Sequence, residues 1–295
     1  MTIRTRRKDR DVEVLFEDVA YHQTDSGPLL ARLYRPRADG LMPAVVSVHG
    51  GRWTSQTRLT NEVLDRSLAA AGIVVMAIDF RMPPAVRYPV PVSDINLAVR
   101  WLKHHSPDFG SAPELVGGVG TSSGGHQITL NAMRPHDPRY CALSLPSSNE
   151  LSAELAYVVA CWPVLDPLAR YQMAKRRNMQ EHIQAHDAYW PDEAAMGEGS
   201  PQLILRREEA VSLPPVLLIQ GTADTIVLPE MTDTFARTYR SRGGDVTLET
   251  FEGQPHTFIT KDPTAAASRA AIKSIERFVL RHAERIAQDM RGSRP

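Results

Sequence analysis

A serine between closely spaced glycines is the first residue of this chain whose neighbours suggest a chemistry. Ser122 lies in Gly120-Thr121-Ser122-Ser123-Gly124, which fits the pattern G-x-S-x-G. In that pattern a serine occupies a sharp turn between a strand and a helix, from which it can attack a carbonyl carbon. The flanking residues must be small because the two backbones crowd them. The pattern also occurs by chance, so an ordinary glycine turn is the alternative.

Such a serine needs a proton acceptor, and His256 is the candidate base among the ten histidines. It follows the predicted strand Val246–Phe251, on a loop that would lie at the carboxyl end of the sheet. His49 belongs to a glycine loop and His126 to the helix after the serine, so neither has this placement. A buried structural histidine is the alternative for His256.

Asp224 is the candidate acid, because it directly follows the predicted strand Val216–Gln220. In chain order it lies between the serine and the histidine, which is the order that accompanies a G-x-S-x-G turn. A carboxylate there can fix the imidazole tautomer and stabilise the imidazolium that forms during attack. Asp233 and Glu230, on the following helix, are the alternatives, and Asp224 itself would otherwise cap a turn or helix.

Acyl transfer also needs donors for the oxygen that becomes negative. His49-Gly50-Gly51 follows the apolar run Ala44–Val48 and forms a loop whose backbone can approach a ligand. We expect an oxyanion hole made by the N–H groups of Gly50 and Gly51 together with that of Ser123. An ordinary glycine turn is the alternative for this loop.

The predicted strands and helices bring these residues to one edge of a sheet. A β-hairpin is predicted over residues 12–23 and 29–36. Strands then alternate with helices, which favours an α/β fold with a mostly parallel sheet and helices on both faces. The strands are predicted at Ala44–Val48, Ile73–Ile78, Leu115–Gly120, Tyr157–Trp162, Val216–Gln220 and Val246–Phe251, and the helices at Asn61–Ala71, Ser93–His104 with Ser93 as N-cap, Gln127–Met133 and Thr264–Asp289.

The chain is predicted to form a single domain over residues 1–295, with an insertion at 168–213. The insertion is polar and is punctuated by Trp190-Pro191. An insertion of this size between core strands is typical of a cap or lid. A disordered surface loop is the alternative, against which the helical spacing of Tyr171–Tyr189 argues.

Composition excludes several classes of partner. Lys+Arg and Asp+Glu number 34 each, so no global field favours nucleic acid or an anionic membrane. No stretch approaches the roughly 18 consecutive apolar residues of a membrane span. The basic first ten residues lack the apolar run of a secretory signal. We therefore expect a cytoplasmic protein with no nucleic-acid or membrane partner.

The two cysteines, Cys141 and Cys161, have no metal-binding spacing. They are predicted to be buried thiols, with a disulfide as the alternative, and thiols fit a reducing cytoplasm. The serine chemistry expected here needs no metal and no organic cofactor.

Four segments between Met42 and Phe278 resemble one known family. They are Val48-His49-Gly50-Gly51-Arg52-Trp53, similar to an HGGGW or HGGYW loop; Asp79-Phe80-Arg81-Met82-Pro83-Pro84 with Tyr88-Pro89-Val90-Pro91 and Asp94, similar to DYRLAP…FPA…D; Gly120–Gly125, similar to GDSAGG; and Gly221-Thr222-Ala223-Asp224 with Pro255-His256. The family is the hormone-sensitive-lipase-like and kynurenine-formamidase-like carboxylesterases of the α/β-hydrolase fold. The resemblance implies that fold and ester hydrolysis.

The chain departs from the family at Arg52, where many relatives have a third glycine. This favours the formamidase-like and feruloyl-esterase-like side. Arg52 could attract an acidic substrate group, and a solvated or salt-bridged arginine is the alternative. Four aromatic residues are candidates for the substrate-pocket wall, although buried aromatics usually belong to the core; they are Trp53, Tyr88, Trp162 and Trp190.

The predicted activity is cleavage of a carboxylic ester of a small or medium substrate through an acyl-enzyme on Ser122. An amidase or formamidase using the same triad is the alternative. A second alternative, from another class, is a ligand-binding protein without activity on this fold. The expected partner is a small-molecule ester or amide, and relatives often form dimers, which leaves a homodimer open.

Overall fold

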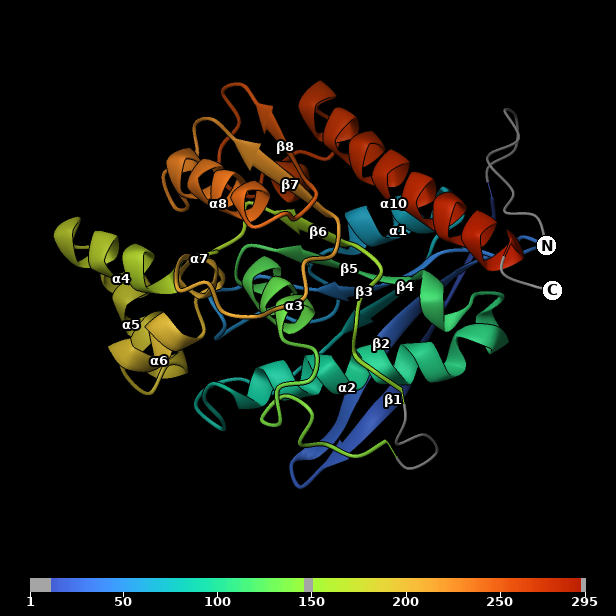
Figure 1. Cartoon of the computed structure of the whole chain (residues 1–295), viewed down its shortest axis with the longest axis horizontal. Coiled ribbons are helices and arrows are strands. Elements are labelled where there is room, and N and C mark those ends of the chain that lie inside the picture. Colours follow the sequence, from blue (N-terminus) through green and yellow to red (C-terminus); the bar gives the residue numbers. More distant parts are fainter. Residues whose placement is uncertain (1–11, 146–150, 293–295) are drawn as a thin grey trace.

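The computed structural model describes residues 12–145 and 151–292, so the basic first ten residues lie outside the described part. Its strands are β1 (Val14–Thr24), β2 (Gly27–Pro36), β3 (Ala44–Val48), β4 (Val74–Ile78), β5 (Val116–Thr121), β6 (Val158–Cys161), β7 (Val216–Gly221) and β8 (Val246–Phe251). They form one sheet in the order β1-β2-β4-β3-β5-β6-β7-β8 (Figure 1). β1 pairs antiparallel with β2 and β2 with β4, whereas all other neighbours are parallel.

Every residue of β3 to β7 is buried. Parallel strands covered on both faces consist of near-continuous apolar runs, and this is why these strands were recognisable in the sequence. The predicted mostly parallel sheet is therefore confirmed, as is the opening hairpin. Because β3 and β5 to β8 run in the same direction, the loops that follow them meet at one edge.

Helices cover both faces of the sheet. They are α1 (Glu62–Ala70), α2 (Val90–His105), α3 (Ser123–Met133), α4 (Pro167–Arg176), α5 (Gln180–Tyr189), α6 (Glu193–Glu198), α7 (Pro201–Arg206), α8 (Pro229–Ser241), α9 (Phe258–Lys261) and α10 (Ala266–Gly292), with 3₁₀ turns at Ser106–Phe109 and Pro113–Leu115. Leu68 of α1 and Ile275 of α10 belong to one apolar cluster with the sheet. Ile95 of α2 and Ile128 of α3 belong to a second cluster on the other face.

Helix α2 begins earlier than the sequence predicted. Pro91 lies in its first turn, where a missing N–H costs nothing because no intrahelical acceptor is available there. Ser93 is therefore inside the helix and is not its N-cap. Its hydroxyl donates a hydrogen bond of 2.7 Å to the carbonyl of Val90.

The segment between β6 and β7 contains the four helices α4 to α7, which lie together at one end of the sheet (Figure 1). This excludes the disordered-loop alternative for most of residues 168–213. Within the predicted helical stretch, a break at Arg177–Met179 separates α4 from α5.

Both cysteines are free, but only one is buried. Cys161 lies inside β6, as predicted. Cys141 is exposed, so the prediction of a buried thiol is wrong there, since it lies in an irregular segment after α3 and not in a core element. Among the described residues, no helix is long and apolar enough to cross a membrane.

Candidate active site

Ser122 occupies a strained turn between β5 and α3. Its backbone angles are φ 52° and ψ −118°, in a region that residues other than glycine rarely adopt. A Cβ on Gly120 would lie 2.6 Å from the carbonyl oxygen of Gly124, and one on Gly124 would lie 2.2 Å from that of Val48. The crowding expected from G-x-S-x-G is therefore present. Strain of this kind is characteristic of functional sites, where the surrounding structure holds it in place.

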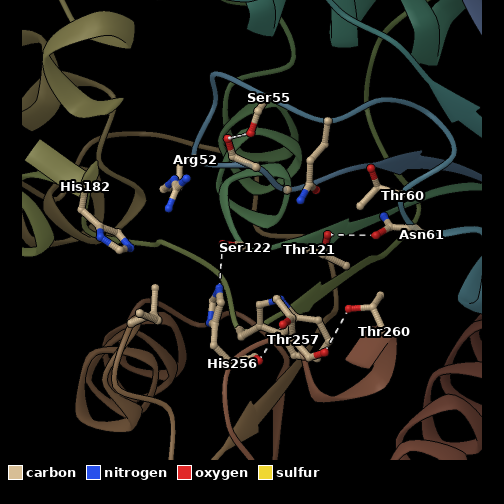
Figure 2. A pocket seen from close by; sticks show the side chains of 15 residues that line it. Arg52, Ser55, Thr60, Asn61, Thr121, Ser122, His182, His256, Thr257 and Thr260 are labelled. Carbon is tan, nitrogen blue, oxygen red and sulfur yellow. Dashed lines mark hydrogen bonds between the residues drawn. The ribbon is translucent and has the colours of Figure 1, made fainter. Parts of the chain in front are cut away.

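A chain of hydrogen bonds joins the three residues that the sequence singled out (Figure 2). The hydroxyl of Ser122 lies 3.0 Å from Nε2 of His256, and Nδ1 of His256 lies 2.7 Å from Oδ2 of Asp224. A carboxylate only accepts hydrogen bonds, so Nδ1 carries the proton. Nε2 is then the unprotonated nitrogen and can accept the proton of the serine hydroxyl.

Asp224 is fixed by its own loop. Its side chain is fully buried, and Oδ1 accepts hydrogen bonds from the N–H groups of Ile226 at 2.8 Å and Val227 at 2.9 Å. The alternatives lie elsewhere: Asp233 pairs with an arginine on the exposed side of α8, and Glu230 is exposed. Of the three carboxylates considered, only Asp224 contacts the imidazole.

The loop after β3 adjoins the serine. A Cβ on Gly50 would lie 3.2 Å from Cβ of Ser122. His49 donates from Nδ1 to the carbonyl of Gly50 at 2.8 Å. In a trans peptide the C=O and the next N–H point in opposite directions, so the N–H of Gly51 points away from the imidazole of His49. Burial keeps the pKa of His49 below its ordinary value, so the ring is neutral at pH 7.

Three backbone N–H groups near Ser122 remain available for a ligand. They belong to Gly50, Gly51 and Ser123, and within residues 12–145 and 151–292 none of them donates a hydrogen bond. The N–H of Ser123 is also at the N-terminus of α3, where the helix dipole favours negative charge. The arrangement can stabilise an oxyanion.

A second chain of hydrogen bonds, which the sequence did not reveal, links this loop to α3 and to the α6–α7 turn. The N–H of Trp53 donates to the hydroxyl of Ser123 at 3.1 Å, and the indole N–H of Trp53 donates to Nδ1 of His126 at 3.1 Å. Nε2 of His126 donates to the carbonyl of Gly199 at 2.8 Å. The only signal was that His126 follows Ser122 by four residues, about one helical turn.

A cavity of about 320 Å³ opens beside Ser122. Of the predicted pocket residues, Arg52 and Trp162 line it, and the rings of Trp162 and His256 are 6.1 Å apart. The sequence missed most of the lining, because these residues come from loops, helices and a strand end whose packing it does not reveal. The missed residues are Ser55, Gln56, Thr60, Asn61, Thr121, His182, Ile226, Thr257 and Thr260.

Trp53, Tyr88 and Trp190 do not line this cavity. Their side chains are buried and pack against one another, with ring centroids 5.9 Å apart for Trp53 and Trp190 and 4.7 Å apart for Tyr88 and Trp190. The pocket-wall prediction for these three is corrected: they form a core cluster between α3 and the helices that follow β6.

Buried histidines predict a loss of stability in acid. Burial lowers the pKa of His126 from its ordinary value of 6.5 to about 4. A folded-state pKa below the unfolded one gives stability that is complete above about pH 6.5 and is lost as pH falls towards 4. We expect His126 to cost roughly 3 kcal/mol of unfolding free energy over that interval. The free energy of unfolding, measured by urea titration at pH 7 and at pH 4.5, should show most of this difference.

The control for this prediction is His126→Gln, whose amide can replace both hydrogen bonds of the imidazole without titrating. It should show a smaller loss of stability between the two pH values. An equal loss in this variant and in the wild type would show that other groups cause the acid sensitivity.

Comparisons with known proteins show one family match and several similar proteins. A family model described as BD-FAE matches residues 32–239. The chain is 27% identical to the probable carboxylic ester hydrolase LipM of Mycobacterium tuberculosis over 71% of this chain and 48% of LipM. It is 29% identical to Esterase LipC of the same organism over 80% of this chain and 59% of LipC. The chain thus spans about half to three fifths of these curated relatives.

Solved structures show the same fold. A thermophilic esterase of Thermogutta terrifontis with bound propionate superposes with a TM-score of 0.72 at 24% identity, covering 93% of this chain and 95% of that one. An inhibited esterase B of Lactobacillus rhamnosis superposes with a TM-score of 0.80 at 22% identity, covering 97% and 92%. The α/β-hydrolase fold expected from the sequence is confirmed.

Proposed function

This chain belongs to the BD-FAE family, and we propose from that premise that it is a serine hydrolase that cleaves carboxylic esters. The observation that carries the proposal is the hydrogen-bonded series Ser122–His256–Asp224, with distances of 3.0 and 2.7 Å. The esterase names of the relatives support the same chemistry. A binding protein without activity would not need the imidazole placed at the serine hydroxyl.

In the proposed reaction, Ser122 attacks the ester carbonyl while Nε2 of His256 accepts the hydroxyl proton. Asp224 stabilises the imidazolium, and the N–H groups of Gly50, Gly51 and Ser123 bind the oxyanion. The imidazolium returns its proton to the leaving alcohol, which leaves an acyl group on Ser122. Water then attacks the acyl carbonyl while the same imidazole accepts its proton. The acyl–oxygen bond breaks, and the imidazolium returns this proton to the Ser122 oxygen as the acid is released.

We also propose that residues 168–213 act as a cap over this site. His182 of α5 lines the cavity, so the inserted helices contribute directly to its wall. The carbonyl of Gly199, between α6 and α7, holds the imidazole of His126 and thereby the loop that carries Trp53.

The proposal is tested by hydrolysis of p-nitrophenyl acetate and butyrate, together with labelling by a fluorophosphonate probe. We expect turnover of the esters and labelling at Ser122. A matched p-nitroanilide and an N-formyl substrate distinguish esterase from amidase, because the amide leaving group is worse. A protein that binds but turns over none of these, and is not labelled, would contradict the proposal.

The hydroxyl of Ser123 is predicted to position the oxyanion loop, because it accepts the N–H of Trp53. In Ser123→Ala the backbone donor of residue 123 remains but this anchor is lost. We expect kcat to fall by roughly tenfold with little change in KM, since small misplacements of catalytic groups are costly. Ester hydrolysis under saturating and limiting substrate measures both constants.

Ser241→Ala is the matched control, because Ser241 is an exposed serine of α8 whose hydroxyl donates to the carbonyl of Thr238 and makes no other hydrogen bond among the described residues. It should behave as the wild type. If Ser123→Ala kept the full wild-type kcat, the hydroxyl would have no positioning role. The same would follow if KM changed by the same factor as kcat.

A further inference from the structure

The cavity beside Ser122 has two chemically different sides (Figure 2). Arg52 and His182 lie on one side of the Ser122–His256 pair, and neutral polar side chains lie on the other. The neutral side consists of Thr60, Asn61, Thr121, Thr257 and Thr260. None of the 15 lining residues, all within the described part of the chain, has a carboxylate. Among these described residues, Arg52 is the one lining side chain with a permanent charge, and no lining carboxylate offsets it.

The guanidinium of Arg52 is available to a ligand. Nη1 donates to Glu181 at 2.9 Å, and the side chain of Glu181 is 77% exposed. An ion pair of this exposure is weak and is easily exchanged for another carboxylate. The guanidinium has five N–H donors, and this is the one bond that it makes within the described residues.

Arg170 adds a second positive charge behind the same wall. Its side chain is 1% exposed, and Nε donates at 3.2 Å to the carbonyl of Ile226, a residue that lines the cavity. Nη1 is buried and has no hydrogen-bond partner in the described residues. Burial lowers the pKa of Arg170 to about 10, so the group stays protonated at neutral pH.

His182 lines the same cavity and carries no charge at neutral pH. The pKa of His182 is lowered to about 4, mainly by burial and to a smaller extent by the charges of Arg170 and Arg52. The imidazole is therefore uncharged at neutral pH. The buried carboxylate of Asp224 partly offsets the charge of Arg170, but it does not line the cavity, and His256, Gln220 and two backbone N–H groups already donate to it.

We propose that the ester cleaved at Ser122 carries a carboxylate close to the scissile bond and that Arg52 binds this carboxylate, in the positive potential of Arg170. The inference rests on the proposed function. A planar guanidinium matches a carboxylate with two parallel hydrogen bonds. A cavity of about 320 Å³ lies within the size range of small-molecule sites.

The test uses two pairs of esters, each matched in shape and differing in charge. Monoethyl succinate and ethyl succinamate carry a carboxylate or its neutral amide on the acyl side. In the second pair, O-acetylglycolate has a carboxylate on the alcohol side of the ester, and O-acetylglycolamide has a neutral amide at the same position. We expect kcat/KM for the charged member of one pair to exceed that of its amide by about tenfold or more, and the ratio to fall as salt is raised. The pair that shows the preference identifies the side.

Two variants assign the preference to the arginine. Arg52→Gln should bring the ratio of the two kcat/KM values close to one. Arg176→Gln, which removes an exposed arginine from the end of α4, should keep the wild-type ratio. Equal rates for acid and amide in both pairs overturn the proposal, as does a preference that survives Arg52→Gln.

Equilibrium binding separates this inference from the proposed function. Calorimetry with Ser122→Ala protein and each of the four esters measures affinity without turnover. Tighter binding of a charged ester, lost in Ser122→Ala/Arg52→Gln, supports the carboxylate site even if no ester is hydrolysed. Hydrolysis of neutral esters with no charge-dependent binding supports the proposed function and overturns the carboxylate site.

Discussion

Replacing Ser122 by alanine should lower kcat for p-nitrophenyl butyrate by about 10⁵–10⁶-fold and abolish fluorophosphonate labelling. The hydroxyl oxygen is the atom that would form the acyl bond, and the described residues place no other hydroxyl within hydrogen-bond distance of the His256 imidazole. Residual activity would come from the oxyanion donors and from substrate binding alone. Initial rates at high enzyme concentration, corrected for the uncatalysed reaction, measure the loss.

The fold should survive this change. Ser122 makes one side-chain hydrogen bond in the described residues, to His256, and alanine meets the same backbone strain at φ 52° as serine does. We expect the thermal midpoint to stay close to that of the wild type. The surface variant Ser241→Ala serves as the activity control. A folded Ser122→Ala protein with more than about a hundredth of wild-type kcat would refute Ser122 as the nucleophile.

Asp224→Asn should lower kcat by about 10⁴-fold, through the tautomer of His256. The amide oxygen of asparagine must face the N–H groups of Ile226 and Val227, because these donors have no other acceptor in the loop. Its NH₂ group then faces Nδ1 of His256 and donates to it. The ring proton is thereby forced onto Nε2, which can no longer accept the proton of Ser122.

The matched control is Asp233→Asn, which changes an exposed carboxylate on α8 that pairs with Arg237. It should retain wild-type kinetics, and both variants should bind substrate with similar KM. Asp224→Asn with kcat within tenfold of wild type would mean that the imidazole does not depend on this carboxylate for its orientation.

The main site residues were predictable because each follows a core strand directly. Ser122 follows β5, Asp224 follows β7 and His256 follows β8, and a parallel sheet brings such positions to one edge. Most of the buried strands were recognisable as apolar runs, and β5 as a short glycine-rich segment before the serine. Local sequence was therefore enough for the sheet and for the three central residues.

What the sequence did not predict depends on packing. The sequence shows a tryptophan at positions 53 and 190 but not whether it lines a cavity or packs in the core. Only the folded chain shows that both are in the core cluster. Cys141 was misjudged for a similar reason. The role of His126 depends on Gly199, which is 73 residues away in the sequence.

Some signals in the 168–213 insertion were present but were not used. Asp192 accepts the N–H of Ala195 at the start of α6, and Ser200 accepts that of Leu203 at the start of α7. Pro201 then occupies the first turn of α7. Aspartate and serine are favoured N-cap residues, and proline is favoured directly after the cap, so these residues predict short helices better than they predict a loop.

The crowding at the serine turn bears on how this protein can be redesigned. Positions 120 and 124 have no free volume for even one methyl group, because backbone atoms of neighbouring segments lie within 2.6 Å of where it would stand. Libraries that seek new substrate ranges should keep both glycines. Randomisation is better directed at His182 of α5, Ile226 of the loop before α8 and Thr260 of α9, which line the cavity.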